Sequence, residues 1–476
     1  MSLDRIYDVL IVGAGPVGLA SAIALHQRGV NNILVIDQAR SFRPVGQIVD
    51  LLPNGLKALK YIDENAYQQI RSTDLKYIQA RGHNSEDEPK ETTKKRFWHQ
   101  KNLQGEVFRS IPLDFDFWFN RYGEGRVSIS WYRLQTELRN LLPQEIVKAN
   151  HRCVNIAQSA SSVTVNCVSN NEISSNPFAH WESQTLDKTK ERDTDSDRLS
   201  EDRQFQAKLV VAADGINSTV RQLVYGNSDL SQWARPQYSE FSTIGCMQID
   251  DVSDNIMQQL ENKYLQGDMV VTLRNDAPDP ESQPTESPRL ILIRRGKNSL
   301  GYLFHFPLSL NSIQNKSPEA IINLAADILI KANFPDVFVR VVELSNPAKL
   351  IHRPYYIHSA NIPHTRSIWS NKRLVLVGDA AHGMPPFAAQ GANQGLEDAA
   401  VIGTAIANII DRNALDDPAV IHSSFSKYEQ LRRPLVAKVQ EATMHNHSWS
   451  QEKWSNYCDE IYRHNLENSI RKFVLN

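Results

Sequence analysis

The chain has 476 residues, of which 41% are hydrophobic and 22% are charged, an ordinary globular balance in a chain long enough for a large two-domain protein. Its 52 basic and 54 acidic residues leave a net charge of −2, which excludes a global field that would favour nucleic acid or an acidic membrane. Four scattered cysteines without a CxxC pair argue against a zinc site, and no uncharged apolar run reaches the roughly 18 residues of a membrane span, so we expect a cytoplasmic protein without a metal.

The first residues predict a β-α-β unit. YDVLIVG (7–13) is typical of a buried strand, PVGLASAIALHQRG (16–29) has helical periodicity, and NILVID (32–37) is a second buried strand. This order implies a parallel sheet with a right-handed crossover. KLVVAADG (208–215) and RLVLVGD (373–379) come much later, and each ends at a Gly/Asp pair. We expect both to complete the same sheet from distant parts of the chain.

The intervening region has a different pattern. RLILIRRG (289–296) and SLGYLFHFPL (299–308) predict strands, and Tyr302, Phe304 and Phe306 alternate onto one face of the second, as in an antiparallel sheet with one covered side. These aromatic residues fit a ligand pocket and a sheet core equally well.

The predicted fold class is therefore α/β, a discontinuous Rossmann-like domain with a mostly parallel sheet, interrupted by a mainly antiparallel-sheet domain and followed by helices. We assign residues 1–75, 125–225 and 371–412 to the first domain, 76–124 and 226–370 to the inserted substrate domain, and 413–476 to a C-terminal helical region. Three polar segments, 83–96, 169–204 and 274–289, have too little apolar surface to offset the entropy of ordering. We expect hairpin tips or disorder there rather than binding elements.

GAGPVG (13–18) lies between the first strand and the first helix, in the context of a dinucleotide-binding fingerprint. Gly13 permits the tight turn, Gly15 lets the backbone approach a pyrophosphate, and Gly18 allows close packing of helix and strand. The helix N-terminus offers free N–H groups and a positive dipole end to the phosphates. Asp37, which ends the next strand, is expected to accept hydrogen bonds from a ribose without a 2′-phosphate. The fingerprint favours NAD or FAD over NADP and does not separate those two.

Three motifs in this order resemble the flavoprotein aromatic hydroxylases, the single-component FAD monooxygenases similar to salicylate hydroxylase and p-hydroxybenzoate hydroxylase. They are GAGPVG with Asp37, then 214-DGINSTVR-221 (the DG motif), and last the GD motif, 378-GDAAHGMPP-386 followed by 391-GANQGLEDA-399. In addition, 43-RPVGQIVDLLPNGLKAL-59 resembles the segment in which an arginine, here Arg43, leads into the isoalloxazine site. The resemblance implies that FAD is the cofactor, that Asp214 is among its ligands, and that NAD(P)H binds transiently, because no second GxGxxG domain is present to hold it.

The resemblance also implies a reaction. NAD(P)H reduces FAD, O₂ gives a flavin hydroperoxide, and the terminal oxygen hydroxylates or epoxidises a small, electron-rich, aromatic substrate. Two alternatives stay open: an accessory FAD-binding protein that has lost its substrate pocket, and another flavin oxidoreductase of the same fold, such as a reductase or halogenase. The sequence does not predict the substrate, the choice of NADH or NADPH, or the oligomeric state.

The residues of the third motif support a flavin site on their own. Asp379, at the C-terminal tip of a buried strand, can accept a hydrogen bond from a ribityl hydroxyl. Gly391, Ala392 and Asn393 open an apolar helix whose N–H groups would stabilise negative charge on reduced flavin. Pro385 and Pro386 fix the turn, lack N–H donors and leave carbonyl groups beside the flavin edge.

Two positions depart from the family pattern. Many relatives carry an arginine where Trp131 stands, so Arg133 is the candidate to replace it as a flavin ligand. Relatives commonly have glycine where Ala389 stands, which implies that φ at this position is not strongly positive.

Other polar residues have a structural interpretation beside the functional one. His382 is either a structural, flavin-adjacent residue or a direct proton carrier. His445 and His447 lack the carboxylate or cysteine partners of a metal site. Glu397 and Asp398 are adjacent on a helix and share no face, so roles in capping or packing are favoured over an acid/base pair.

Overall fold

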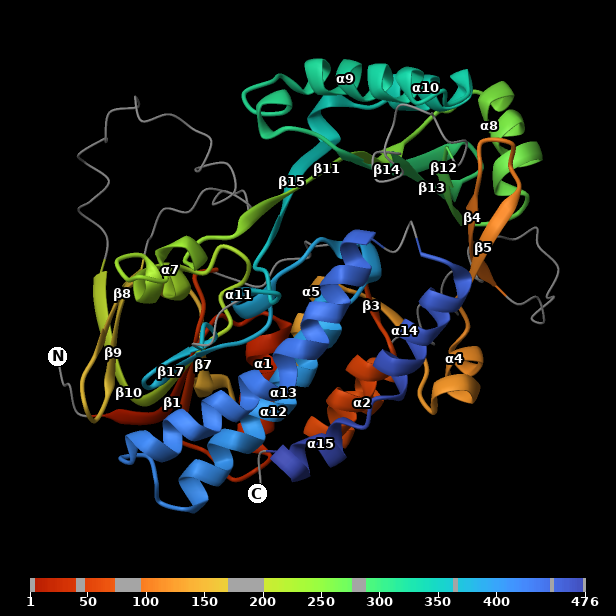
Figure 1. Ribbon diagram of the computed structural model, residues 1–476. Coiled ribbons are helices and arrows are strands. Elements are labelled where there is room, and N and C mark those ends of the chain that lie inside the picture. The colour runs from red at the N-terminus through yellow and green to blue at the C-terminus, as the bar shows by residue number, and fades with distance from the viewer. Residues whose placement is uncertain are drawn as a thin grey trace.

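The computed structural model describes residues 5–39, 48–72, 96–169, 201–275, 288–362, 367–445 and 449–473. Its elements form two sheets. The first is covered by helices that include the last described element, and the second lies above it in Figure 1. The predicted α/β class, with a mostly parallel sheet, an inserted antiparallel sheet and C-terminal helices, is confirmed.

The first sheet joins segments that are far apart in sequence. Strands β7, β2, β1, β10 and β17 lie side by side in this order and run parallel, with β16 antiparallel at one edge. The hairpin of β8 and β9 pairs with the early part of β10. The bounds are β1 (Ile6–Val12), β2 (Ile33–Ile36), β7 (Val147–Lys148), β8 (Arg152–Gln158), β9 (Val163–Ser169), β10 (Glu201–Ala212), β16 (Ser370–Asn371) and β17 (Leu374–Leu376).

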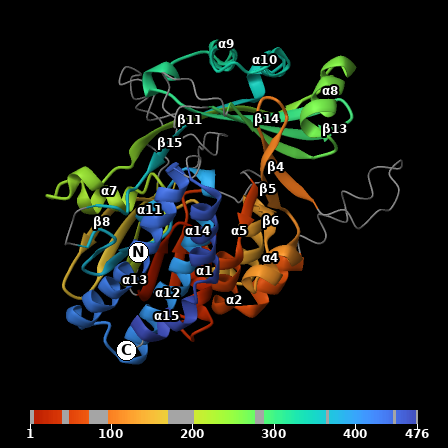
Figure 2. The same ribbon diagram turned by 45° about the vertical axis from the view of Figure 1, so that its right-hand side comes forward.

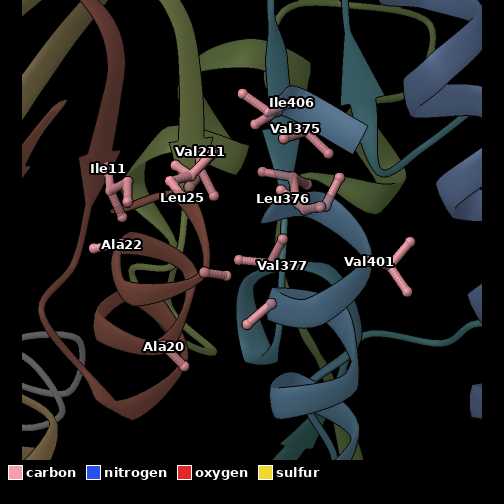
Figure 3. Packing of buried hydrophobic residues seen from close by; sticks show 14 of the residues in the cluster. Ile11, Ala20, Ala22, Leu25, Val211, Val375, Leu376, Val377, Val401 and Ile406 are labelled. Atoms are coloured by element: carbon pink, nitrogen blue, oxygen red, sulfur yellow. The ribbon is translucent and has the colours of Figure 1, made fainter. Parts of the chain in front are cut away.

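Helices α1 (Pro16–His26) and α12 (Gly391–Asp411) cover one face of this sheet side by side. Figure 3 shows Ile11 and Val211 of the strands near Ala22 and Leu25 of α1, and Val375 near Ile406 of α12. Small residues permit the close approach of the helices, since a Cβ on Gly403 would lie 2.4 Å from Ala24 Cβ. The alanine- and glycine-rich sequences of the two helices therefore predict their contact.

Further helices enclose α12. Helix α2 (Pro53–Ile62) and helix α13 (Pro418–His445) both pack on it, while α5 (Trp131–Asn140) packs on α1 and α7 (Thr219–Tyr225) on β8. The predicted C-terminal helices are α13, α14 (Gln451–Arg463) and α15 (Leu466–Phe473). A small antiparallel pair, β3 (Ile48–Leu51) with β6 (Val127–Ser130), and helix α4 (Phe115–Tyr122) lie near α14 and α2.

The second sheet has the order β15, β11, β14, β13, β12, β4, β5, and its neighbours are antiparallel except for β12 and β4. Helices α8 (Asp254–Leu260), α9 (Pro318–Lys331) and α10 (Asp336–Glu343) cover its outer face (Figures 1 and 2). The strand bounds are β4 (Phe97–Lys101), β5 (Val107–Pro112), β11 (Gln237–Ile249), β12 (Val270–Arg274), β13 (Arg289–Gly296), β14 (Ser299–Pro307) and β15 (Leu350–Ile357).

Tyr302, Phe304 and Phe306 are buried in the core beneath these helices, so the sheet-core alternative holds and the pocket alternative is wrong for them. Two of the polar insertions join paired strands, because Ser169 pairs with Glu201 and Arg274 pairs with Arg289. Residues 73–95, 170–200 and 276–287, which contain most of the three insertions, lie outside the described residues. None of the described helices has the length and apolar character to cross a membrane, and the four cysteines are buried and unpaired.

Candidate functional site

The predicted motifs meet at one edge of the first sheet. Gly13 N–H donates to Ile36 O over 2.8 Å, Ala213 N–H donates to Val12 O over 2.8 Å, and Val377 N–H donates to Ala212 O over 2.9 Å. The residues that follow β2, β1, β10 and β17 therefore line up, and they bring Asp37, the glycine loop, Asp214 and Asp379 to the carboxyl ends of parallel strands. This is the edge at which ligands bind in such sheets.

The three glycines of GAGPVG have different surroundings. Gly13 has φ +106°, and a Cβ there would lie 2.4 Å from Ala213 O. A Cβ on Gly18 would lie 1.9 Å from Gly13 O, so helix and strand are in the close contact that the sequence predicts. A Cβ on Gly15 would meet nothing nearer than Trp131 Cζ2 at 3.9 Å. The backbone at Gly15 is thus open to a ligand, while the other two glycines are required by the protein itself.

Asp37 fixes the loop. Its Oδ2 accepts from Ala14 N–H over 2.6 Å and its Oδ1 from Ala39 N–H over 2.7 Å. Burial raises the pKa of Asp37, and the two backbone N–H groups oppose that effect. Each oxygen keeps a second lone pair, so hydrogen bonds from a ribose remain possible in this arrangement.

Trp131 and Gln135, one turn apart on α5, face the glycine loop. Gln135 Nε2 donates to Ala14 O over 2.7 Å, a contact that sequence reasoning missed and that no motif signals. Arg133 lies on another side of the helix, exposed, with its Nε 3.4 Å from Glu137 Oε1. Because positions two apart on a helix point in different directions, the structure does not bring Arg133 to the loop. Arg43 lies outside the described residues.

Asp214 of the DG motif forms its hydrogen bonds within the motif's own turn. Asp214 accepts from Ser218 Oγ over 2.6 Å and from Val220 N–H over 3.0 Å, so its carboxylate caps helix α7. Arg221 is buried, and its Nη1 donates to the carbonyl oxygens of Ala380 and Ala381, both over 2.9 Å. Burial lowers the pKa of Arg221 to about 10, which leaves it charged at neutral pH. Arg221 therefore ties the DG motif to the GD motif, a role that sequence reasoning did not predict.

The GD motif forms a glycine turn and the short helix α11 (Asp379–His382). Gly378 has φ +57°, a conformation that favours glycine. Asp379 is exposed, and desolvation by the neighbouring protein raises its pKa. No hydrogen bond to its carboxylate is present among the described residues, and Oδ1 lies 3.7 Å from where a Gly391 Cβ would stand. An unpartnered carboxylate thus lies beside the N-terminus of α12.

The turn between α11 and α12 differs from one expectation. Ala389 has φ +52°, so the prediction that φ is not strongly positive there is wrong. It ends the 3₁₀ turn Pro386–Ala388, and a left-handed residue at such an end lets the chain reverse into the next helix. Pro385 is buried and Pro386 is exposed.

Asn393 uses its side chain within the protein. Its Oδ1 accepts from Leu52 N–H over 2.8 Å, and its Nδ2 donates to Asp50 O and Ala389 O. Only its backbone N–H, with those of Gly391 and Ala392 in the first helical turn, is left to face a ligand.

A buried cluster of charges supports residues 378–390, between β17 and α12, which we call the GD turn. Asp398 accepts from Gly378 N–H over 2.9 Å, from His382 Nε2 over 2.5 Å and from Arg432 Nε over 2.9 Å, and these partners hold its pKa low against the effect of burial. Arg432 also pairs with Glu397, so the two adjacent carboxylates converge on one guanidinium although they leave the helix in different directions. The packing role predicted for Glu397 and Asp398 takes the form of this ion-pair cluster.

His382 is completely buried, and the centre of its ring lies 5.0 Å from that of Trp369, with the two rings tilted by 47°. Its position, bonded to Asp398 behind the turn, supports the structural alternative. The described residues contain no group of histidine, cysteine and carboxylate side chains that could hold a metal. His447 lies outside them.

These residues fit FAD. The open backbone at Gly15 can receive the pyrophosphate, Asp379 offers a free acceptor to the ribityl chain, and the N-terminus of α12 offers N–H donors. The fit rests on observations at three points along a single edge.

Comparisons with known proteins agree with this geometry. The family described as FAD binding domain matches residues 6–47 and 357–443, which include the glycine loop and the GD motif. The 3-amino-4-hydroxybenzoate 2-monooxygenase PtmB3 of Streptomyces platensis is 23% identical over 431 residues, 90% of this chain and 85% of that protein. The 6-hydroxynicotinate 3-monooxygenase of Bordetella bronchiseptica is 22% identical over 445 residues, covering 93% and 91%.

Solved structures share the fold. The salicylate hydroxylase substrate complex superposes with a TM-score of 0.62 at 16% identity and covers 98% of this chain and 97% of its own. Klebsiella pneumoniae HpxO, complexed with FAD and uric acid, gives 0.58 at 16% identity and covers 99% and 97%.

Proposed function

We propose that this chain, an FAD-dependent monooxygenase of the flavoprotein aromatic hydroxylase type, takes electrons from NAD(P)H and inserts one oxygen atom of O₂ into a small, electron-rich aromatic molecule. The observation that carries the proposal is the convergence of the glycine loop, the DG motif and the GD motif on one sheet edge. Asp379, whose carboxylate accepts no hydrogen bond from any described residue, lies there beside the N-terminus of α12. Relatives whose names specify hydroxylated aromatic acids support the substrate class.

The protein contributes binding, orientation and charge. Bound FAD supplies the chemistry, which is reduction by NAD(P)H and activation of O₂. Asp37 accepts hydrogen bonds from the adenosine ribose, the backbone at Gly15 approaches the pyrophosphate, and Asp379 accepts from a ribityl hydroxyl. The N–H groups of Gly391, Ala392 and Asn393 stabilise negative charge near the flavin by about 0.3–1 kcal/mol, and up to about 2 kcal/mol when partly buried.

Other residues act through these. Arg221 and the cluster of Asp398 with Arg432 hold the GD turn from behind, and His382 belongs to that support. We assign no proton transfer to His382, because the ring is buried behind the turn and bonded to Asp398. Pro385 and Pro386 fix the chain path next to the flavin edge.

The domain boundaries follow from the same proposal. We assign 1–75, 125–225 and 371–412 to the FAD domain and 76–124 with 226–370 to the substrate domain. The pairing of β4 with β12 supports the inclusion of the earlier segment in the substrate domain. Buried, unpaired cysteines support a reducing location such as the cytoplasm.

The test uses the purified protein in three steps. A flavin absorption band in the native protein, released on denaturation as FAD, is expected first. NADH and NADPH oxidation is then measured with and without a panel of phenols and hydroxylated aromatic acids, and the product is analysed by mass spectrometry under ¹⁸O₂. Stimulated oxidation with incorporation of one labelled atom supports the proposal. A flavin-containing protein whose NAD(P)H oxidation no aromatic compound changes would instead be an accessory FAD protein.

A further inference from the structure

Phe387 of the GD turn contacts four strands of the second sheet with one ring. The centre of the Phe387 ring lies 5.4 Å from that of Phe241 on β11 and 5.2 Å from that of His305 on β14. The ring of Tyr355, on β15, lies 5.5 Å away, and the guanidinium carbon of Arg289, on β13, lies 4.3 Å away. These four strands are neighbours in the sheet. A single aromatic side chain therefore joins the GD turn to the second sheet.

The register of the second sheet explains why these four side chains meet. His305 is paired with Thr243 on one side and with Arg289 on the other, so the three share one face. Phe241 precedes Thr243 by two positions and lies on the same face. Tyr355 Oη lies 3.3 Å from His305 Nε2, across β11. The alternate residues of these strands fill the core under α9 and α10, which leaves the four side chains on the inner face.

The backbone that carries Phe387 is held on both sides. Pro385 and Pro386 precede it and fix φ at two successive positions, and Phe387 itself lies in a 3₁₀ turn. Met384 and Ala389, before and after this stretch, pack against the apolar core formed by residues of α4, α13 and α14. Because its backbone is constrained, the Phe387 ring has little freedom to follow the second sheet if that sheet moves.

The second sheet has other connections to the rest of the molecule at its two edges. Strands β11 and β15 run from it toward the first sheet (Figure 1), and the residue after β15, His358, donates its N–H to Gly383 O over 2.9 Å. At the other edge, the Arg109 guanidinium on β5 lies 5.1 Å from the centre of the Trp454 ring on α14. Phe387 contacts strands between these two edges, where it can fix the distance of the sheet from the turn.

We propose that Phe387 is a positioning residue, whose ring sets the separation between the inner face of the second sheet and the GD turn. Asp379 and the residues that lead into α12 belong to the same turn, so this separation controls how much water reaches the site proposed for the flavin. Exclusion of water strengthens the electrostatic interactions inside such a site. Only this last step rests on the function proposed above, because the ring contacts belong to the protein itself.

The test compares hydrogen–deuterium exchange of Phe387→Ala with that of the wild-type protein, with and without FAD. The loss of three ring contacts and one cation–π contact is expected to make opening at the GD turn at least about 10-fold more frequent. The peptides that contain the amides of Gly383, Ala389 and His358 should exchange faster by that factor. In the FAD-bound protein, acrylamide should quench the flavin fluorescence more strongly than in the wild type. Acrylamide is neutral, so its approach does not depend on the charge of Arg289.

Phe205→Ala is the matched control. Phe205 is also half-buried, its ring centre lies 5.5 Å from that of His151 and 5.2 Å from Lys148 Nζ, and all three residues lie in the first sheet or beside it. This variant is expected to leave exchange at the GD turn and quenching of the flavin unchanged. Phe387→Leu keeps apolar volume without an aromatic face, so an intermediate result is expected. It replaces Phe387→Ala if the melting temperature shows that the alanine variant does not fold.

A second variant tests whether Phe387 acts through its ring contacts. Phe241→Ala should speed exchange at the GD turn in the wild-type protein and have little effect in Phe387→Ala, because residues in contact are coupled. Additive effects of the two substitutions would overturn the proposal. Exchange and quenching in Phe387→Ala equal to the wild type, or the same changes in Phe205→Ala, would also overturn it. Failure of the proposed function is separate, since it appears as missing FAD or absent stimulation of NAD(P)H oxidation, whereas exchange of the apoprotein needs neither.

Discussion

Gly15 and Gly18 lie three residues apart in one motif, and the structure predicts opposite consequences for the same substitution at each. A Cβ on Gly18 would lie 1.9 Å from Gly13 O, so Gly18→Ala forces helix α1 away from the turn. Overpacking of this kind typically costs about 1–3 kcal/mol of the free energy of unfolding. At Gly15, φ is −68° and ψ is 172°, and the nearest atom lies 3.9 Å from a Cβ. Gly15→Ala is therefore expected to stabilise the apoprotein by about 0.4–1 kcal/mol.

FAD affinity is expected to fall in Gly15→Ala, the variant whose apoprotein is the more stable of the two. A methyl group on Gly15 occupies the space in which the backbone would approach the pyrophosphate. The loss of one charge-assisted hydrogen bond to a phosphate costs about 1.5–3 kcal/mol of binding free energy. The dissociation constant of FAD is then expected to rise roughly 10- to 100-fold. Gly18→Ala should weaken FAD binding only to the extent that it unfolds the protein.

The assay measures the melting temperature of each apoprotein after removal of flavin and the FAD affinity by quenching of flavin fluorescence. The expected pattern is an unchanged or higher melting temperature with weak FAD binding for Gly15→Ala, and a lower melting temperature for Gly18→Ala. A Gly15→Ala protein that binds FAD as the wild type does would place the pyrophosphate elsewhere. A large loss of apoprotein stability in this variant would refute the reading of Gly15 as open backbone.

Three further predictions concern the same edge. Asp379→Ala should weaken FAD binding about 10-fold. The FAD affinity of the wild-type protein should rise as pH increases through the raised pKa of Asp379, because a ribityl hydroxyl donates to the ionised carboxylate. An FAD affinity that fluorescence titrations find independent of pH would contradict this role. Arg432→Met leaves Glu397 and Asp398 buried without their cation, so it should lower the free energy of unfolding by about 3–5 kcal/mol. Arg340→Met removes an exposed ion pair and should lower it by less than about 1 kcal/mol. Equal shifts in melting temperature would contradict the difference. Trp131→Arg puts a cation beside the glycine loop and should tighten FAD binding about 10-fold; unchanged affinity would exclude Trp131 from the phosphate side of the site.

Much of the fold could be predicted from local patterns. Buried apolar runs that end in Gly or Asp gave β1, β10 and β17, and the small residues of α1 and α12 agree with their close packing. Element type depends on neighbours in sequence, which a pattern contains. The φ of Ala389 could not be read in this way, because tertiary contacts of the turn hold an alanine in a conformation that its own preference disfavours.

The partners of the site residues were harder to predict. Arg221 meets Ala380 and Ala381, and Arg432 meets Asp398, over separations in sequence that no spacing rule describes. The helical rule that adjacent residues share no face holds for the directions of Glu397 and Asp398, yet a guanidinium with donors on two edges reaches both. Arg289 stood in a predicted strand, but only the register of neighbouring strands shows that it lies between Arg274 and His305.

The GD turn joins these separate contacts into one structural unit. Arg221 holds its first part through the carbonyl groups of α11, Asp398 holds the N–H of Gly378, and Phe387 meets the inner face of the second sheet. Asp379 lies within the same short segment, between Gly378 and the two carbonyl groups that Arg221 binds. A displacement of the turn would therefore move the proposed ribityl contact and disturb the contact of Phe387 with the second sheet. Buried hydrogen bonds to a charged group, each worth about 1.5–3 kcal/mol, oppose such a displacement. Contacts from both sheets therefore oppose movement of Asp379, whose carboxylate is the proposed ribityl acceptor.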